Sequence, residues 1–294
     1  LQSGLNLNKT NFELANIFPL QDQSTETYRY EAIWSPQVSI LYKPATLTTF
    51  YVSASRGFSL PSVDETLTAT GTINTDIKPE TGYNFELGAK FYFVKRRLFA
   101  DFAVYRMQIK DLLVAQRVAD DQYVGINAGE TLHKGFEGTV NYIVRLSDKS
   151  SLSPYFSGSI GQYKFQEFTN NDQDFNGNEL PGVPKTKLNA GFTLNLFNWY
   201  LLADFQYTDK MPIDDANSIY TKSWRTLNLK SGYWIKVHNS LTASIAGGIN
   251  NVLNERYASM ILVNATSPPN GTPRYFYPGL PVNYYVNANF TYTF

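Results

Sequence analysis

The chain has 294 residues, and its 25 lysines and arginines balance its 25 aspartates and glutamates, which excludes a global electrostatic attraction to nucleic acid or anionic lipid. Cysteine is absent, so disulfide bonds and thiolate metal sites are excluded. Aromatic residues make up 15% of the chain and charged residues 17%, a composition rich in rings and poor in charge for a soluble domain. No run approaches the ~18 apolar residues of a transmembrane helix.

Alternation of apolar and polar residues at a period of two dominates the chain and predicts β-strands. In TGYNFELGAKFYF, every second residue from Tyr83 to Phe93 is apolar, and the residues between include Glu86 and Lys90. No long amphipathic helix is predicted. Eleven strands are expected, at residues 28–42, 47–56, 79–94, 97–109, 129–145, 152–164, 185–197, 199–209, 223–237, 240–250 and 282–294.

The connections between these strands alternate between short and long. The short ones read KPAT, VKRR, LSDKSS, FN and VHN, and the long ones are residues 56–78, 110–128, 165–184, 210–222 and 251–281. Outer-membrane barrels have this asymmetry, because their periplasmic turns are short and their extracellular loops long. The predicted fold class is therefore all-β, an antiparallel transmembrane β-barrel over residues 28–294, with residues 1–27 as an outer loop or a partial strand.

Charged residues share one face of the predicted strands. In a membrane barrel this face lines the lumen and the apolar face meets lipid. A soluble β-sandwich binding module is the alternative that alternation leaves open, because its polar faces meet water outside; it would stay soluble after membranes are removed. The charged set is Glu86, Lys90, Asp101, Glu137, Asp204, Lys230 and Lys236.

Strand direction predicts that the expected strands do not close a barrel. Residues 282–294 follow a long outer loop and run towards the periplasm, and counting back gives residues 28–42 the same direction. An antiparallel barrel cannot close between two strands of the same direction. The missing upward strand is therefore absent from the chain or lies within residues 1–15, and we expect a C-terminal fragment of a longer barrel.

Five stretches, in order, resemble the C-terminal half of a TonB-dependent outer-membrane receptor. They are YVSASRGFSLPSVDETL, IKPETGYNFELGAKFYFVKRRLFADFAVYRMQIKDLL, GINAGETLHKGFEGTVNY, GGINNVLNERYASM and the closing aromatic strand. The fourth departs from the family pattern, with Val252 for leucine and Asn254 for aspartate. The closing Phe290, Tyr292 and Phe294 are similar to the signal that the barrel assembly machinery recognises, and we expect the apolar residues of this strand to face lipid.

The resemblance implies half of a 22-stranded barrel in the outer membrane of a Gram-negative bacterium, surrounded by lipid and lipopolysaccharide. It also implies a plug domain and a TonB box, which are not in this sequence, and through the plug a partnership with the TonB complex. The implied function is active transport of a small-molecule ligand, a ferric siderophore or similar iron chelate, with no role for nucleic acid. Uptake of vitamin B12, oligosaccharide or peptide, a passive porin, and an adhesin or secretion-associated barrel that presents its loops are the alternatives.

Arginine and tyrosine residues in the predicted loops are the candidates for ligand contact. Arginine holds anionic groups through two hydrogen bonds, and tyrosine supplies a flat surface and a hydroxyl. The alternative is that these side chains pack within the loops or form the aromatic girdle at the membrane interface. The candidates are Arg56, Arg117, Tyr123, Tyr220, Arg274, Tyr275 and Tyr277.

The loop NNDQDFNGNELPG contains a candidate calcium site at Asp172, Asp174 and Asn176. The spacing of these oxygen-bearing residues before Gly177 matches the first half of a calcium loop, but Val183 stands where that loop has its glutamate. A solvated turn is the alternative. No other cofactor is expected, and iron is expected only as part of the transported chelate.

An enzyme is not expected. The two histidines, His133 and His238, are far apart in sequence, and neither has a Gly-x-Ser-x-Gly elbow or a metal-spaced partner. His238 lies in the predicted VHN turn, and His133 lies near the outer end of its predicted strand.

Overall fold

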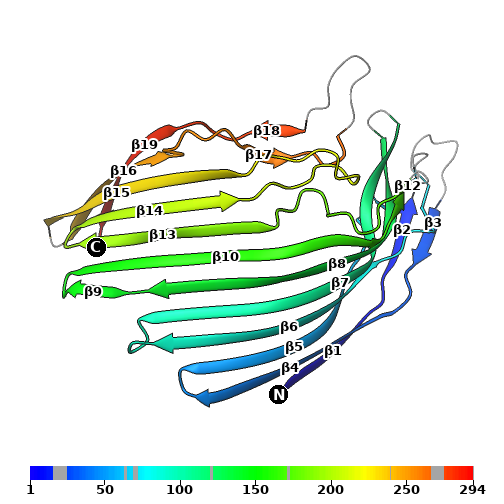
Figure 1. Cartoon of the computed structure of the whole chain (residues 1–294), viewed down its shortest axis with the longest axis horizontal. Coiled ribbons are helices and arrows are strands. Elements are labelled where there is room, and N and C mark those ends of the chain that lie inside the picture. Colours follow the sequence, from blue (N-terminus) through cyan, green and yellow to red (C-terminus); the bar gives the residue numbers. More distant parts are fainter. Residues whose placement is uncertain are drawn as a thin grey trace.

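The computed structural model describes residues 1–15, 25–62, 65–68, 72–119, 122–170, 173–238, 240–265 and 275–293. Over these residues the chain forms strands and turns and contains no helix, and so no helix that could cross a membrane. Most strands belong to a single 13-stranded antiparallel sheet (Figure 1). The predicted all-β antiparallel architecture is confirmed.

The main sheet runs in the order β1-β4-β5-β6-β7-β8-β10-β13-β14-β15-β16-β19, and β9 pairs with β10 beside this path. The strands of the main sheet are β1 (Gln2–Asn8), β4 (Ile33–Ala45), β5 (Thr48–Ser59), β6 (Glu80–Phe93), β7 (Leu98–Ala119), β8 (Gln122–Tyr142), β9 (Val144–Ser147), β10 (Ser150–Glu167), β13 (Thr186–Leu196), β14 (Trp199–Thr208), β15 (Trp224–His238), β16 (Leu241–Asn250) and β19 (Asn283–Tyr292). Three small hairpins lie outside it: β2 (Asn11–Ala15) with β3 (Thr25–Arg29), β11 (Thr169–Asn170) with β12 (Gln173–Asp174), and β17 (Ala258–Ile261) with β18 (Phe276–Pro278).

The strand that the parity argument required lies at the start of the chain. Gln2–Asn8, in the segment predicted as an outer loop or a partial strand, forms β1 and pairs antiparallel with β4 over seven positions. The predicted strand at residues 28–42 is divided in the structure, because β3 ends at Arg29 and β4 begins only at Ile33. The path through the sheet therefore begins with an upward strand and ends with a downward one.

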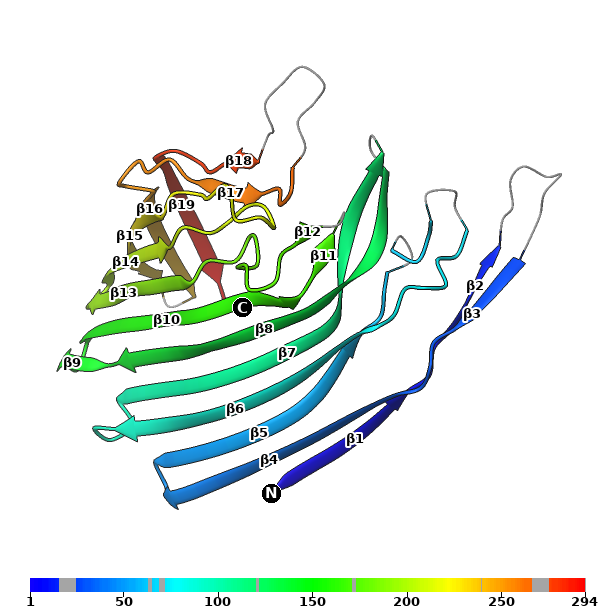
Figure 2. The same cartoon turned by 45° about the vertical axis from the view of Figure 1, so that its right-hand side comes forward.

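Short and long connections lie at opposite ends of the sheet, as predicted. The tight turns after β4, β6, β13 and β15 gather at the left of Figure 1, and the hairpins β2–β3 and β17–β18 lie at the right with the long loops (Figures 1 and 2). The chain ends at the same end as the tight turns (Figure 1).

The two faces of the sheet differ in chemistry along its whole width. On the apolar face, Val52, Leu87, Val104, Phe136 and Ile160 form one row across five neighbouring strands, and each is 43–56% exposed. Holding such side chains in water forgoes about 1.5–3 kcal/mol each, so this face requires an apolar environment. All seven charged residues predicted to share a face lie on the opposite, polar face, as the strand register shows.

Tyrosines on the polar face lie across glycines of the neighbouring strand. Five such pairs stand directly opposite each other in the ladders: Tyr51–Gly88, Tyr105–Gly135, Tyr155–Gly191, Tyr200–Gly232 and Tyr285–Gly248. A Cβ added to any of these glycines would come within 2.3–2.8 Å of the tyrosine ring or its hydroxyl. The glycines thus make room for rings that cover the wall, an arrangement that fixes strand register.

The tyrosine hydroxyls connect strands that are not neighbours. Tyr155 donates a 2.5 Å hydrogen bond to Asp204, which crosses over β13, and the Tyr105 and Tyr163 hydroxyls are 2.8 Å apart across β8. Asp204 also accepts a 3.0 Å hydrogen bond from Gln206. These bonds satisfy polar groups of the wall and join its strands across the ladders.

The prediction of a long loop at residues 110–128 is wrong. The β7–β8 ladder continues to Ala119 and Gln122, and this arm rises beyond the rest of the sheet (Figure 2). The arm bends where Asp111 and Gly129 adopt positive φ angles of 55° and 39°. Gly129 is required there, because a Cβ would lie 1.6 Å from the Glu167 carbonyl oxygen. Beyond the bend, the arm's Leu112 and Val114 pack on a small apolar core of Phe165, Phe168 and Leu180.

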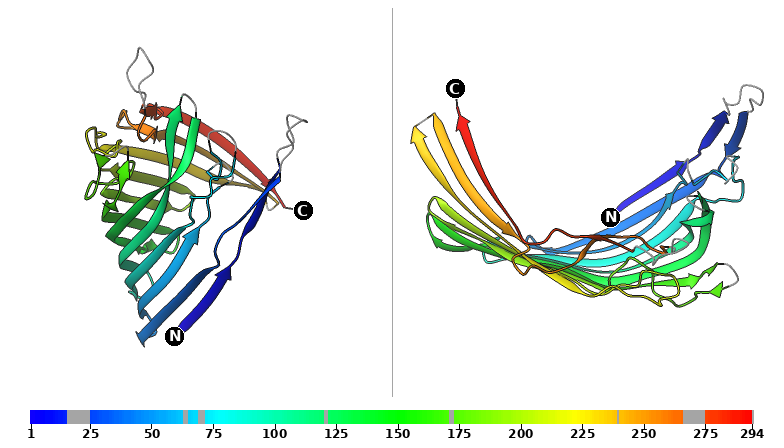
Figure 3. Two further views of the ribbon diagram at one scale, coloured as in Figure 1. Left: turned by 90° about the vertical axis from the view of Figure 1, so that its right-hand side faces the viewer. Right: turned by 90° about the horizontal axis from the view of Figure 1, so that it is seen from above.

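The sheet is an open, curved trough whose two edges lie apart (Figure 3). These edges are β1 and β19, and within the described residues neither has a partner on its outer side. On β19, Tyr284, Val286 and Phe290 are 72–81% exposed. An unpaired strand edge is not stable in a bilayer, so both edges require further strands.

Candidate functional site

A recess of about 270 Å³ opens on the polar face at the loop end of β14, β15 and β16. Most of its lining side chains carry amides, hydroxyls or aromatic rings, and none of them is charged. The lining residues are Gln206, Trp224, Thr226, Asn228, Asn250, Asn251, Tyr257, Leu280 and Asn283.

Asn251 builds one wall of this recess from a position that is only 3% exposed. Its backbone N–H donates to Asn228 at 2.9 Å, and its side-chain amide donates to the carbonyls of Glu255 and Leu280 at 2.9 and 3.1 Å. Its side-chain oxygen accepts a 3.0 Å hydrogen bond from the Glu255 N–H. One asparagine thus fixes both ends of the connection between β16 and β19 against β15.

The other wall is aromatic. The rings of Trp224 and Tyr257 lie 4.7 Å apart at 30°, and the Asn250 amide donates to Asn283 at 2.9 Å beside them. Flat rings next to amide groups offer stacking and hydrogen bonding to an uncharged or charge-delocalised ligand. None of the predicted ligand residues lines this recess. Its two rings, Trp224 and Tyr257, come from separate segments that only the fold brings together, so residue type alone did not indicate them.

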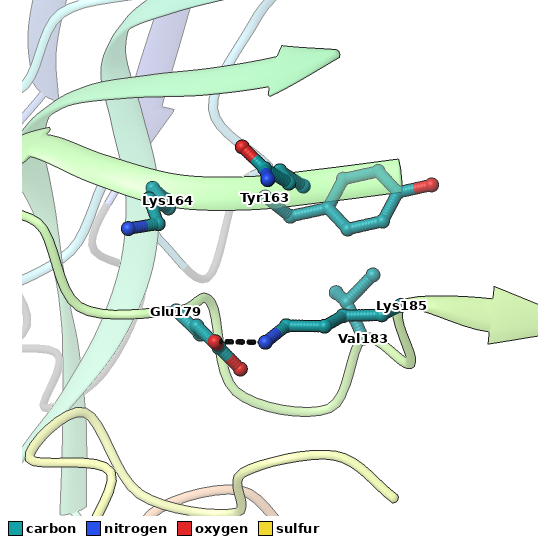
Figure 4. Close-up of a pocket in the computed structure, with 6 residues that line it drawn as sticks. Tyr163, Lys164, Glu179, Val183 and Lys185 are labelled. Carbon is teal, nitrogen blue, oxygen red and sulfur yellow. Dashed lines mark ion pairs between the residues drawn. The ribbon is translucent and has the colours of Figure 1, made fainter. Parts of the chain in front are cut away.

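A second, smaller recess of about 130 Å³ lies beside β10 (Figure 4). It is lined by Gln162, Tyr163, Lys164, Glu179, Val183 and Lys185. Glu179 and Lys185 form an ion pair across it (Figure 4). Its remaining cation, Lys164, belongs to a strand rather than to a loop.

The prediction that Arg56 lies in a loop is wrong. Arg56 lies within β5, opposite Tyr83, on the apolar face and so away from the lumen. Its guanidinium is 5.6 Å from the Tyr83 ring and donates a 3.1 Å hydrogen bond to the Trp34 carbonyl. Residue 56 stood at the boundary between the predicted strand 47–56 and the predicted loop 56–78, and β5 continues three residues past it, to Ser59.

Of the other predicted ligand residues, Tyr220, Tyr275 and Tyr277 lie in the long connections at the loop end, and ligand contact by them stays a prediction. Tyr220 faces the Lys210 ammonium at 5.3 Å, and Tyr277 is 53% exposed on β18. Arg117 and Tyr123 are paired in the backbone ladder near the end of the β7–β8 arm. The remaining candidate, Arg274, lies outside the described residues.

The candidate calcium loop stays a prediction. Asp174 accepts a 2.8 Å hydrogen bond from the Asn176 N–H, and Asn176 accepts one of 2.7 Å from the Phe168 N–H. These bonds form a turn, which is the alternative to a calcium loop, and Gly177 in it has a φ of 79°. Asp172 lies outside the described residues, and within them no three acidic or histidine side chains gather.

The two histidines lie at opposite ends of the sheet. His133 is on the polar face, with Nε2 3.0 Å from the Thr131 hydroxyl and its ring against Tyr163. His238 is exposed at the turn that follows β15. In the predicted assembly signal, Phe290 and Tyr292 lie on β19, and Phe294 lies outside the described residues.

The residues that carry the family resemblance hold the wall and loops together. Asn127 accepts the Lys78 N–H at 2.8 Å and donates to the carbonyls of Lys78 and Asp111. Glu80 accepts a 2.6 Å hydrogen bond from the Leu113 N–H, and Glu86 accepts one of 2.6 Å from Tyr51. These motif residues therefore fix the loop ends and the polar wall.

Burial raises the pKa of Asp215, in the loop after β14, above the ordinary aspartate value. Its backbone N–H and one carboxyl oxygen both bond the Asn264 side chain, at 3.0 and 2.9 Å. Because the folded pKa lies above the unfolded one, the folded loop binds more protons, and its stability falls as the pH rises through the range between the two pKa values.

We expect Asp215→Asn to remove this pH dependence and to slow amide hydrogen exchange in the loop at pH 7. Asp214→Asn serves as a contrast, because the Asp214 carboxylate accepts hydrogen bonds from both the backbone N–H and the hydroxyl of Ser218. Faster exchange in Asp215→Asn than in wild type would contradict this account.

The fold and wall define a class of protein, the β-barrels of the outer membrane. Residues 3–252 match the family described as TonB dependent receptor-like, beta-barrel. The chain therefore belongs to the TonB-dependent receptors. Members of this family are transport receptors of the Gram-negative outer membrane that bind small-molecule ligands and interact with TonB.

Several relatives share this fold. Over 240 residues, the chain is 27% identical to the "Probable TonB-dependent siderophore receptor PiuA" of Acinetobacter baumannii, covering 75% of this chain and 30% of that protein. The crystal structure of PiuA matches with a TM-score of 0.73 at 21% identity, over 98% of this chain and 40% of that one. The ferric citrate transporter FecA matches at 0.73 with 16% identity, over 98% and 42%, and the copper transporter OprC at 0.71 with 14% identity, over 98% and 44%. The chain thus spans less than half of each of these relatives.

Proposed function

We propose that this chain forms the C-terminal part of the barrel of an outer-membrane receptor that imports a ferric siderophore or a similar iron chelate. Ligand would bind at the loop end and pass through the lumen with energy from TonB, acting through a plug domain. Family membership and the likeness to PiuA support the iron chelate as cargo, and the amide and aromatic recess supplies a place for it to bind.

The recess is the observation that carries the proposal. Its rings and amides face the polar side of the wall at the end where an extracellular ligand arrives. Binding there would need no proton transfer or nucleophile, and the two histidines are placed apart from it. The proposed protein is therefore a receptor and not an enzyme.

The uncharged lining also favours a second cargo, a neutral oligosaccharide. Sugars stack on tryptophan and tyrosine and bond amide side chains, which is the chemistry the recess offers. A highly charged chelate would need the loop arginines and lysines in addition.

Growth of a bacterial strain that lacks its own siderophore receptors tests the proposal. The receptor is expressed as the cell makes it, under iron limitation, and single ferric siderophores are supplied in turn. We expect growth with at least one chelate and none with the iron-free compound. Growth that depends instead on an oligosaccharide as sole carbon source, with no chelate restoring growth, would support the second cargo and overturn the first.

A further inference from the structure

The hydrogen bonds around the recess of about 270 Å³ determine which atoms it offers to a ligand. Its side-chain amides bond to groups that can only accept or only donate, so the orientation of each amide follows from chemistry. Gln206 lines the recess and donates a 3.0 Å hydrogen bond to the carboxylate of Asp204. Its amide nitrogen is therefore turned to Asp204, and its Oε1 has no partner among the described residues.

The amide of Asn250 is oriented by a short chain of hydrogen bonds. Asn283 donates to the Pro281 carbonyl at 3.0 Å, so the side-chain oxygen of Asn283 is the atom that accepts from Asn250 at 2.9 Å. This leaves Oδ1 of Asn250 without a partner in the part of the chain that the structure describes. Gln206 and Asn250 both line the recess. Their free oxygens accept hydrogen bonds and cannot donate one to an anion.

A carboxylate lies behind these amides. Asn228, the third lining amide, accepts the Asn251 N–H at 2.9 Å and has its amide nitrogen 3.5 Å from Asp204. The donors to Asp204 are thus neutral, and they include the Tyr155 hydroxyl at 2.5 Å. Lys230 stands diagonally from Asp204 in the β14–β15 ladder, but the two form no ion pair in the described structure. The charge of Asp204 therefore makes the recess electrostatically negative.

The aromatic wall adds a second attraction for a positive charge. Trp224 and Tyr257 lie with their rings 4.7 Å apart, and Gly279 makes room for Tyr257, because a Cβ there would lie 2.4 Å from its ring. The faces of such rings attract ammonium groups. The loop cations Lys222 and Arg256 are not part of the lining. Rings, amide oxygens and a carboxylate together suit an organic cation that donates hydrogen bonds, and they repel an anion.

The size of the recess limits how much of a chelate can enter it. Sites that enclose a whole small molecule usually have ~300–1,000 Å³, and this recess is smaller. One arm of a chelate therefore enters, and the metal centre stays outside.

We propose that the recess binds the ammonium-bearing arm of a ferric hydroxamate chelate, with the ammonium group donating to Gln206 Oε1 and Asn250 Oδ1 beside the rings of Trp224 and Tyr257. The inference rests on the proposed import of an iron chelate and names its class. Three hydroxamates neutralise ferric iron, so such a chelate is positive only at its arm. Three catecholates leave the metal centre triply negative, and Asp204 disfavours that class.

Binding of three iron chelates to the complete purified receptor, measured by isothermal titration, tests the inference. The probes are ferrioxamine B, a linear ferric trihydroxamate with a free ammonium group, its N-acetyl derivative, which is neutral and has the same metal centre, and a ferric tricatecholate. Asp204→Asn removes the charge behind the recess. Glu137→Gln is the matched control, because Glu137 is a carboxylate on the same face of the sheet but three strands away, on β8.

We expect wild type to bind ferrioxamine B about tenfold more tightly than its N-acetyl derivative, because the acetyl group removes the charge that Asp204 and the rings attract. Asp204→Asn should abolish most of this preference and bind the N-acetyl derivative as wild type does, which also shows that the variant is folded. Glu137→Gln should keep the preference, and the tricatecholate should bind most weakly.

Two results would overturn the inference and leave the import of an iron chelate standing. One is equal affinity of wild type for the two hydroxamates, and the other is tightest binding of the tricatecholate. Failure of every ferric chelate to bind, together with no growth on any chelate, would contradict the proposed function as well.

Discussion

Replacing Gly191 with valine should prevent stable folding of the wall or lower its free energy of unfolding by about 3 kcal/mol, at the upper end of what overpacking costs. A Cβ at Gly191 would lie 2.3 Å from the Ala203 carbonyl oxygen and 2.6 Å from the Tyr155 hydroxyl. The tyrosine could swing away, but it would give up its bond to Asp204 across β13. The carbonyl belongs to the neighbouring strand and cannot move without breaking the ladder.

Gly57→Val is the matched control for this change. Gly57 lies on the same polar face, opposite Gly82, and a Cβ there meets nothing within 4 Å. Valine is well suited to strands, so this variant should unfold at the same urea concentration as wild type or slightly higher. Urea denaturation of both refolded receptors, followed by tryptophan fluorescence, measures the difference. Equal midpoints for the two variants would show that the tyrosines and glycines do not determine the packing of the wall.

Removing both rings of the recess, with Trp224→Ala and Tyr257→Ala, should weaken ligand binding by about 30- to 1000-fold. Buried aromatic side chains contribute most of the energy at such sites, and each loss costs ~1–2 kcal/mol or more. The chelate identified by the growth experiment serves as the ligand, and isothermal titration with the purified receptor measures its affinity. The thermal midpoint of the barrel should change little, because the two rings lie at the loop end and outside the ladder contacts of the tyrosines and glycines.

The chain offers a close control for this double substitution. Tyr200 and Trp234 form a second tyrosine–tryptophan pair on the polar face, with the same ring separation of 4.7 Å. They lie at the opposite end of β14 and β15, next to the short turns. Alanine at both positions should leave affinity unchanged. If that variant loses binding as strongly as the Trp224 and Tyr257 variant, the recess is not the place where ligand binds.

Alternation predicted most of the sheet because one face meets an apolar medium and the other a polar one, so strands such as β6 and β14 keep a strict period of two. The β7–β8 arm was not predicted, because its residues beyond the bend pack on a local core and do not alternate between two media. Beyond the bend at Asp111, Leu112 and Leu113 follow each other without alternation, and Val114 packs with Leu112 on the core of Phe165 and Phe168. β1 was only a candidate, since its apolar residues, Leu5 and Leu7, extend over a short segment.

The candidate site was predicted less well than the sheet. Loop arginines and tyrosines were chosen by residue type, yet Arg56 belongs to a strand and to the apolar face. Trp224 and Tyr257 are separated by 33 positions, and their stacking depends on the path of the chain after Asn251. The sequence did contain a signal in the family-like stretch GGINNVLNERYASM, where Asn251 and Tyr257 both occur. The part that Asn251 and Tyr257 play in the recess depends on the fold, in which Asn251 bonds Asn228, Glu255 and Leu280.

Uptake of a radiolabelled ferric chelate by intact cells tests the central claim most directly. Cells that express the complete receptor are compared with and without TonB, at chelate concentrations below those that allow passive entry. An energised receptor predicts accumulation in the cells that contain TonB and only surface binding in those that lack it. Accumulation at the same rate in both strains would contradict active transport and would indicate a passive pore instead.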